Sequence, residues 1–300
     1  MARALPALRI TDCRPLAGGF RNSNFKIVAG SYAFVLRFYR HQRALCRKEL
    51  DLMRLVGAAI PVPEVVHAEP DGLDGVPPFV VTRFVEGITF HDLTLGGDCA
   101  AIAQAACSAG ETLSAIGRFA FDRPGWLAPG PAVADPIIEG ADPFPRFVDQ
   151  CLSSPHLAAR MPADLRNRTH STVWRAAGEL AELARHTRLV HGDFNARNLL
   201  VRPMGGQWRV AAVLDWEFAV SGSPLADIGN FLRYESHARP LAEPHFSAGY
   251  GRLPEGWRRL ARLLDLAALC EFLVREELRA GLAEEVLAVV RATVAGCHLL

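Results

Sequence analysis

Apolar and polar residues alternate with a period of two along much of the first ninety residues, and this pattern predicts a small antiparallel sheet. Residues 25–28 and 32–38 are expected to form a hairpin that turns at Gly30. Helical spacing follows in the next segment and predicts one helix beside the sheet. The other elements expected in this part are the helix at 42–56 and strands near 63–67 and 79–84.

Beyond Gly87 the apolar residues recur mostly with the helical period. Helices are predicted at 98–117, 144–152, 164–186, 257–279 and 282–295, with an irregular Pro- and Gly-rich connection at 122–145. Short strands are predicted at 189–190, 199–201 and 210–214, the last two joined by a turn at Gly205-Gly206. We therefore expect an α+β fold with two lobes, an N-terminal sheet lobe (residues 1–87) and a mainly helical C-terminal lobe (residues 88–300).

Composition narrows the function classes without naming one. The 300 residues are 50% hydrophobic, enough for a substantial core, and carry a net charge of +1. Such a balance provides no overall field that would attract nucleic acid or an anionic membrane. The seven cysteines are scattered without C-x-x-C spacing, and no run approaches the ~18 apolar residues of a membrane span. We expect a cytoplasmic protein with no nucleic-acid or membrane partner; its oligomeric state is unknown from sequence.

The most informative stretch is H-G-D-F-N-A-R-N at 191–198, followed by L-D-W-E at 214–217. Phosphoryl transfer needs a carboxylate beside the attacking hydroxyl and separate oxygen ligands for Mg²⁺ near the triphosphate. Asp193 suits the first role, and Asn198 and Asp215 suit the second. Since short strands bracket the first motif and precede the second, these side chains are expected on two tight loops.

The same pattern resembles known kinases. Protein kinases use H-R-D-x-x-x-x-N followed by a metal-binding Asp-Phe-Gly, whereas this chain has Gly192 and Asp215-Trp216-Glu217. Both differences, and the absence of a following A-P-E, point away from protein kinases. Together with P-L-A-D-I-G at 224–229, these motifs resemble the aminoglycoside phosphotransferase family, whose wider kin include choline, homoserine and macrolide kinases. That resemblance implies a protein-kinase-like fold.

The resemblance also implies supporting roles around the catalytic loop. His191 is expected to brace the loop from behind instead of acting as a base, and Asp227 to buttress it. Three interpretations of Glu217 are left open: it holds a water on a second Mg²⁺, it faces the substrate, or it is an exposed loop carboxylate. Trp216 is expected to pack beneath the metal loop.

A Gly-rich loop precedes the predicted hairpin. Its glycines would let backbone N–H groups approach phosphates, and its polar side chains would add donors. It matches neither of the usual phosphate-loop patterns, so a plain β-turn is the alternative. The candidate phosphate-binding residues are Gly18, Gly19, Ser23 and Asn24.

Alternation along the second strand places Val35 and Arg37 on one face. In kinases the corresponding strand places a small residue over the adenine and a lysine on the α/β-phosphates, paired with a helix glutamate. Val35 and Arg37 match those positions, with arginine in place of lysine, and Glu49 is the expected partner. The alternatives are an Arg37 that faces solvent, or Lys26 as the phosphate ligand.

Residues 79–87 run from an apolar strand into Gly87 and resemble the hinge between kinase lobes. Thr82 is expected behind the nucleotide base, and the backbones of Arg83 and Val85 at its hydrogen-bonding edge. An edge strand is the alternative. Because backbone recognition leaves no side-chain signature, ATP and GTP cannot be separated.

The predicted function is transfer of the γ-phosphoryl group of ATP (or GTP), with Mg²⁺, to a hydroxyl of a small molecule. The acceptor is either an aminoglycoside-like antibiotic or a metabolite such as choline, homoserine or a sugar. It is expected between the loop after Asp215 and the C-terminal helices, where acidic and basic residues are mixed. A non-catalytic nucleotide-binding regulator is the hypothesis from another class, supported only by the arginine at position 37.

Overall fold

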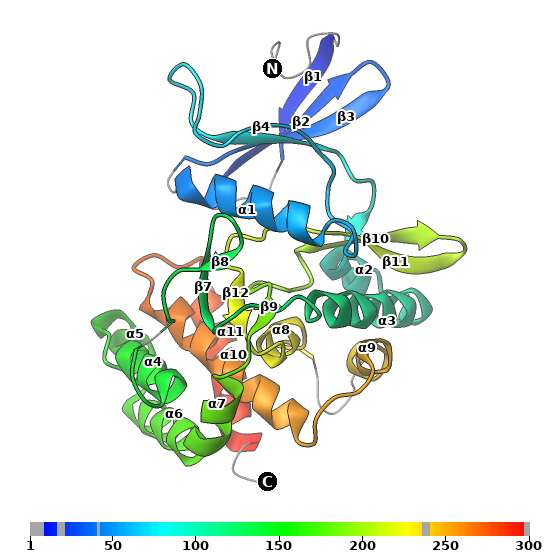
Figure 1. The fold of residues 1–300 in the computed structure, drawn as a ribbon. Coiled ribbons are helices and arrows are strands. Elements are labelled where there is room, and N and C mark those ends of the chain that lie inside the picture. The colour runs from blue at the N-terminus through cyan, green and yellow to red at the C-terminus, as the bar shows by residue number, and fades with distance from the viewer. Residues whose placement is uncertain (1–8, 17–21, 41–42, 138, 236–240, 297–300) are drawn as a thin grey trace.

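The computed structural model describes residues 9–16, 22–40, 43–137, 139–235 and 241–296. It shows the expected kinase-like arrangement of a sheet lobe above a mainly helical lobe (Figure 1). The five strands of the sheet are all antiparallel and lie in the order β1-β2-β3-β5-β4. Their bounds are β1 Ile10–Pro15, β2 Ser23–Ala29, β3 Tyr32–Phe38, β4 Val65–Glu69 and β5 Phe79–Arg83.

The sheet buries both faces in part, as the alternation along β3 predicts. Phe34 and Leu36 point into one apolar cluster, whereas Arg37 points to the opposite face, where helix α1 (Arg43–Val56) packs. The cluster on that second face includes Leu50 and Val80. Helix α1 then enters the other lobe, because Leu52 and Val56 belong to the large core of the helical part. The helix therefore couples the two lobes.

The helical lobe agrees with most of the predicted spans. Its helices are α2 Phe90–Gly96, α3 Cys99–Ile116, α4 Pro143–Leu152, α5 Pro155–Arg160, α6 Ala163–Arg175, α7 Ala177–Leu183, α8 Leu225–Phe231, α9 Glu243–Tyr250, α10 Trp257–Val274 and α11 Leu282–Gly296. In the described part of the chain, no helix has both the length and the apolar character needed to cross a membrane.

Three predicted spans are wrong in detail. The helix expected at 164–186 is two helices, because the backbone of Ala176 leaves helical geometry (φ −95°, ψ 9°) between α6 and α7. The helix expected to reach Arg279 ends at Val274, since Arg275 is extended. The connection expected to be irregular contains two short paired strands, β7 Gly125–Ala128 and β8 Ala132–Val133.

Four strands position the two motif loops. Strand β9 (Arg188–Val190) pairs with β12 (Val220–Gly222), and β10 (Leu199–Met204) pairs with β11 (Gln207–Val213). The chain runs from β9 to β10 through the H-G-D motif and from β11 to β12 through the L-D-W-E motif. The two loops consequently lie side by side, and the Leu214 amide donates to the Asn198 carbonyl across them at 2.9 Å.

Strand β6 (Ile88–Thr89) follows the five-stranded sheet in the chain and pairs with β10 in the helical lobe. The β10–β11 hairpin turns at Gly205 and Gly206, both with positive φ, as an N-G-like turn requires. The division of the chain after Gly87 stays a prediction.

Helices α3 and α9 cross at a contact that only glycine permits. A Cβ at Gly249 would lie 2.0 Å from the Cys107 carbonyl oxygen, and one at Gly110 would lie 2.1 Å from the Phe246 carbonyl oxygen. Both obstructing atoms are backbone, so no side chain can move aside. Close packing of these helices therefore depends on both glycines.

We expect Gly249→Ala to lower the free energy of unfolding by about 1–3 kcal/mol, because overpacking forces the helices apart. The matched control is Gly178→Ala at an exposed position of α7, where a Cβ meets nothing within 4 Å. That change should instead stabilise by about 0.5–1 kcal/mol, the usual gain over glycine in a helix. Chemical denaturation of both variants measures the difference; equal stabilities would contradict the crossing constraint.

Candidate active site

The catalytic loop holds Asp193 through amide donors on both carboxylate oxygens. Asn195 Nδ2 donates to Asp193 Oδ1, and Asn198 Nδ2 donates to Asp193 Oδ2, each at 2.7 Å. Asn198 Nδ2 also lies 2.9 Å from the Asp193 carbonyl. Burial raises the pKa of Asp193, and the hydrogen bond from Asn195 offsets part of that rise. The arrangement presents one half-buried carboxylate in a fixed orientation.

His191 braces this loop, as the sequence predicted. Its Nδ1 accepts the Asp193 amide at 3.2 Å, so its Nε2 carries the proton and donates to the Leu214 carbonyl at 3.0 Å. Burial lowers the pKa of His191 to about 4, which keeps the ring neutral at physiological pH. The ring also packs on Trp216, whose side chain is fully buried beneath the second loop. His191 thus links the two loops structurally.

Asp227 holds the start of the catalytic loop from the other side. From helix α8, its carboxylate accepts the amides of His191 at 2.6 Å and Gly192 at 2.9 Å. Burial raises its pKa to about 7, against the effect of these backbone donors. Gly192 has φ +80°, and a Cβ there would lie 2.2 Å from the Phe218 carbonyl. The glycine in the H-G-D motif is therefore required where the loops touch.

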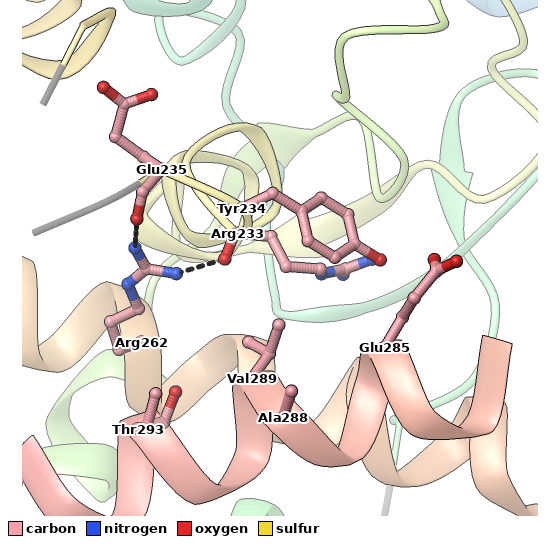
Figure 2. Close-up of a pocket in the computed structure, with 9 residues that line it drawn as sticks. Arg233, Tyr234, Glu235, Arg262, Glu285, Ala288, Val289 and Thr293 are labelled. Carbon is pink, nitrogen blue, oxygen red and sulfur yellow. Dashed lines mark hydrogen bonds between the residues drawn. The ribbon is translucent and has the colours of Figure 1, made fainter. Parts of the chain in front are cut away.

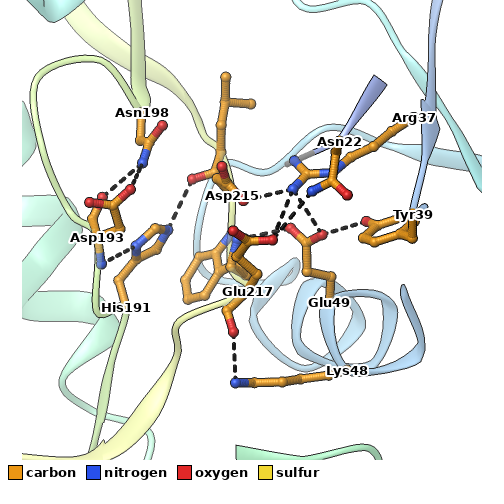
Figure 3. Close-up of polar contacts among 12 residues, drawn as sticks. Asn22, Arg37, Tyr39, Lys48, Glu49, His191, Asp193, Asn198, Asp215 and Glu217 are labelled. Carbon is orange, nitrogen blue, oxygen red and sulfur yellow. Dashed lines mark hydrogen bonds and ion pairs between the residues drawn. The ribbon is translucent and has the colours of Figure 1, made fainter. Parts of the chain in front are cut away.

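Three carboxylates converge on the guanidinium of Arg37 (Figure 3). Arg37 Nη2 lies 2.7 Å from Asp215 Oδ1, 3.4 Å from Glu49 Oε2 and 3.7 Å from Glu217 Oε2. These nearby anions raise the pKa of Arg37 even though burial opposes its charge. A solvent-facing Arg37 is thus excluded by the geometry. Lys26, the sequence-based alternative, lies elsewhere, with its Nζ 3.4 Å from the centre of the Phe84 ring.

Glu49 fixes the second loop to helix α1. Its Oε1 accepts the Trp216 amide at 2.9 Å, and its Oε2 accepts the hydroxyl of Tyr39. Burial raises the pKa of Glu49, and the charge of Arg37 counteracts that rise. The adjacent Lys48 donates to the Glu217 carbonyl at 2.9 Å, and burial lowers its pKa to about 8. Two consecutive residues of α1 therefore hold the L-D-W-E loop.

Sequence reasoning missed several members of this cluster. Lys48 and Tyr39 carried no motif signal. Glu217 is buried instead of exposed, and Asn22 Nδ2 donates to its Oε2 at 3.3 Å. The helical period of α1, which buries both Lys48 and Glu49, could have identified the lysine as a candidate.

The residues predicted to contact nucleotide are only partly brought together. Val35 and Thr82 are paired across β3 and β5 on the same face as Arg37, and Asn24 lies opposite Arg37 on β2. Asn24 Oδ1 and Arg37 Nε are buried and lack a hydrogen-bond partner among the described residues. Ser23 begins β2 beside them. Gly18 and Gly19 lie outside the described residues.

At the predicted hinge, the Arg83 amide is already used, because it donates to the Glu64 carbonyl at 2.8 Å. Its side chain pairs with the Glu64 carboxylate and is exposed. Only the carbonyl of Arg83 therefore remains suited to recognise a base. Val85 follows β5 in half-buried, irregular backbone.

A cavity of about 400 Å³ opens between the end of α8, α10 and α11 (Figure 2). Its wall combines charged residues with the apolar side chains of Ala288, Val289 and Ala292. On this wall, Arg233 forms a buried ion pair with Asp265 at 2.6 Å, and Arg233 and Asp193 each influence the pKa of the other. Arg233, on the wall of the cavity, thus lies within electrostatic reach of Asp193.

Three acidic residues in the region where the acceptor is expected form contacts within the protein. Glu235 lines the cavity but accepts the amides of Leu241 and Ala242. Glu243 pairs with Arg258, and Glu271 pairs with Arg275. The helices therefore present a mixed surface, not an acidic one.

A family model described as "Phosphotransferase enzyme family" (APH) matches residues 12–263. The chain belongs to this family. The match spans both lobes and includes the loops of Asp193 and Asp215. It establishes a phosphotransferase relationship without specifying the acceptor.

Two curated relatives carry the same kind of sequence within longer proteins. "Acyl-CoA dehydrogenase family member 11" of Gallus gallus is 28% identical over 224 residues, which are 72% of this chain and 27% of that protein. The Homo sapiens protein of the same name is 32% identical over 82 residues, 27% of this chain and 10% of that protein. The chain thus spans about a quarter of the length of the first of these relatives.

Solved structures share the fold at low identity. The ternary complex of a thermostable aminoglycoside phosphotransferase APH(4)-Ia mutant with ADP and hygromycin B has a TM-score of 0.70 at 18% identity, covering 95% of this chain and 94% of that one. The GDP complex of aminoglycoside 2'-phosphotransferase-IIIa has a TM-score of 0.72 at 18% identity, covering 98% and 96%.

We expect Arg37→Ala to weaken binding of the Mg²⁺ nucleotide and Arg37→Lys to retain part of it, because lysine keeps the charge but not the planar fork. Glu49→Ala should act in the same direction but more weakly. Calorimetric titration of the single and double variants should give a coupling of about 0.5–3 kcal/mol. Arg47→Ala, which removes an exposed arginine of α1, is the control and should bind normally. Additive effects would contradict the contact.

Proposed function

We propose that this protein transfers the γ-phosphoryl group of a nucleoside triphosphate to a hydroxyl group of a small molecule. The observation that carries the proposal is the pairing of two loops that places Asp193 and Asn198 beside Asp215 and Arg37. This set supplies a carboxylate for the hydroxyl, oxygen ligands for a metal and a cation for the triphosphate. Membership of the phosphotransferase family supports the reaction class.

In this proposal the acceptor hydroxyl donates its proton to Asp193 as the phosphoryl group is transferred. The neutral His191 and the amides held by Asp227 keep the carboxylate in place. A carboxylate with a raised pKa accepts a proton more readily than an ordinary aspartate. Asp193 is therefore assigned as the proton acceptor.

The metal assignment fits the donor chemistry of the loops. Asn198 uses its Nδ2 on Asp193, which leaves its Oδ1 as a hard oxygen donor. Asp215 supplies a carboxylate, and the carboxylate of Glu217 lies near it because both contact Arg37 Nη2. Among the described residues, no group of three acidic, histidine or cysteine side chains could hold a metal alone. Mg²⁺ would accordingly be held by Asn198, Asp215 and the phosphates, and would neutralise the charge of the triphosphate.

The nucleotide is assigned to the face of the sheet that carries Val35 and Arg37. The buried Nε of Arg37, which lacks a partner among the described residues, suits a phosphate oxygen. In this proposal Arg37 Nη2 would leave the Asp215 carboxylate and bind a phosphate oxygen instead. The phosphate roles of Ser23, Asn24, Gly18 and Gly19 stay predictions.

The base is assigned to the hinge, with Thr82 behind it and the Arg83 carbonyl and the Val85 backbone at its edge. Solved neighbours hold ADP or GDP, so adenine and guanine are both retained as candidates. The contacts of Arg37 with both Asp215 and Glu49 support the enzyme proposal over the regulator hypothesis.

The cavity beside Arg233 is the proposed acceptor site, because Arg233 connects it electrostatically with Asp193. Aminoglycosides are candidate acceptors, since a solved neighbour holds hygromycin B. A hydroxylated acyl-CoA is a second candidate, because the curated relatives are named for acyl-CoA dehydrogenase. Choline, homoserine and sugars remain candidate acceptors.

The scattered cysteines favour a cytoplasmic location.

The test is acceptor-dependent formation of nucleoside diphosphate from Mg·ATP and Mg·GTP across these five acceptor classes. We expect one class to stimulate turnover, and Asp193→Ala to lower that turnover by roughly 10²–10⁴ without loss of nucleotide affinity. Asp164→Ala, which removes an exposed carboxylate of α6, should keep the parent rate. Nucleotide binding without stimulation by any acceptor would favour the regulator, and a normal rate for Asp193→Ala would remove its catalytic assignment.

A further inference from the structure

Asn195 lies two residues after Asp193 and hydrogen-bonds to it through both its backbone amide and its side chain. Its Nδ2 donates to the Asp193 Oδ1 at 2.7 Å and lies 3.2 Å from the Asp193 carbonyl. The opposite oxygen, Oδ2, receives Asn198 Nδ2 at 2.7 Å. Each oxygen of the Asp193 carboxylate therefore accepts a hydrogen bond from a different side chain.

The orientation of the Asn195 amide is fixed by a separate contact. The Arg197 backbone N–H donates to Asn195 Oδ1 at 2.9 Å, so the Nδ2 end must face Asp193. The backbone supports the same geometry, since the Asn195 amide donates to the Asp193 carbonyl and the Asn198 amide donates to the Asn195 carbonyl. Reversing the Asn195 side chain would place two acceptors together at Asp193 and two donors together at Arg197.

We propose that Asn195 is a positioning residue that holds the Asp193 carboxylate for the acceptor hydroxyl. This inference rests on the proposed function. Asn198 is shared with the metal in that function, whereas the contacts of Asn195 lie within the loop itself. Asn195 is thus the dedicated restraint on rotation of the Asp193 side chain, and each carboxylate oxygen keeps one lone pair for the incoming proton.

The charged surroundings of Asp193 make such a restraint useful. The negative charge of Asp215 raises the pKa of Asp193, and the positive charge of Arg233 lowers it. Asp193 in turn raises the pKa of Asp227. Asp215 and Arg233 lie on different segments, so the Asp193 carboxylate is repelled from one segment and attracted from the other. A carboxylate held by Asn198 alone could rotate in this field, and small displacements of a reacting group reduce rates steeply.

The inference is tested by turnover of Asn195→Ala and Asn195→Asp in the parent and in the Asp193→Ala background. Asn195→Ala should lower kcat by about 10- to 100-fold while the KM for nucleotide stays within about twofold. Asn195→Asp, which has the same shape but replaces the donor with a like charge, should be slower still. In the Asp193→Ala background, Asn195→Ala should have almost no further effect, because both changes act through one group. Arg202→Ala, an exposed residue of β10, is the control for kcat.

A crystal structure of Asn195→Ala gives a readout that does not depend on an acceptor. We expect Asp193 to occupy more than one rotamer there; a single rotamer, unchanged from the parent, overturns the inference. An additive effect in the Asp193→Ala background overturns it as well. If Asp193→Ala slows turnover but Asn195→Ala does not, this inference fails alone. If neither change affects turnover, the proposed function fails with it.

Discussion

A single guanidinium facing three carboxylates is the interaction on which the active site depends. Arg37 comes from the sheet, Glu49 from helix α1, and Asp215 and Glu217 from a loop of the helical lobe. Since these residues come from the sheet, helix α1 and one loop, the cluster sets the position of the sheet and α1 relative to the L-D-W-E loop. It also leaves more negative than positive charge at the centre, an environment that favours a divalent cation. In the proposed function Asp215 would exchange Arg37 for the metal, whereas Glu49 would keep its contact with Arg37.

The strand pairs explain why this cluster can form at all. Pairing of β9 with β12 and of β10 with β11 places both motif loops at one end of short strands. Hydrogen bonds formed by the buried side chains of Asp227 and His191 then fix the two loops. Asp227 accepts backbone amides at the start of the H-G-D motif, and His191 crosses from that loop to the Leu214 carbonyl. These contacts satisfy buried polar groups that would otherwise destabilise the fold, so stability and reaction geometry depend on the same residues.

The parts predicted best from sequence are those with a strong local signal. Alternation along β3 correctly placed Arg37 on the opposite face from Phe34, and the resemblance to the aminoglycoside phosphotransferase family correctly implied a kinase-like fold. The break between α6 and α7 was missed because the helical period continues through Ala176. Short elements such as β12 and α8 were missed because too few residues carry a period.

Contacts between distant segments were the least predictable. The burial of Lys48 against the Glu217 carbonyl joins residues 169 positions apart, and neither has a local signature for that bond. Likewise, the mixed charges of the C-terminal helices gave no pairing pattern. Only the structure shows that Arg233 turns inward to Asp265 beside a cavity, whereas Glu243 pairs with Arg258.

The most direct test of the account is a crystal structure of the protein with Mg²⁺ and a non-hydrolysable triphosphate. The account predicts metal density bound by Asn198 Oδ1 and Asp215, with the guanidinium of Arg37 moved from Asp215 to the α/β-phosphates and still paired with Glu49. A bound nucleotide that contacts neither Arg37 nor an Asp215-bound metal would contradict it.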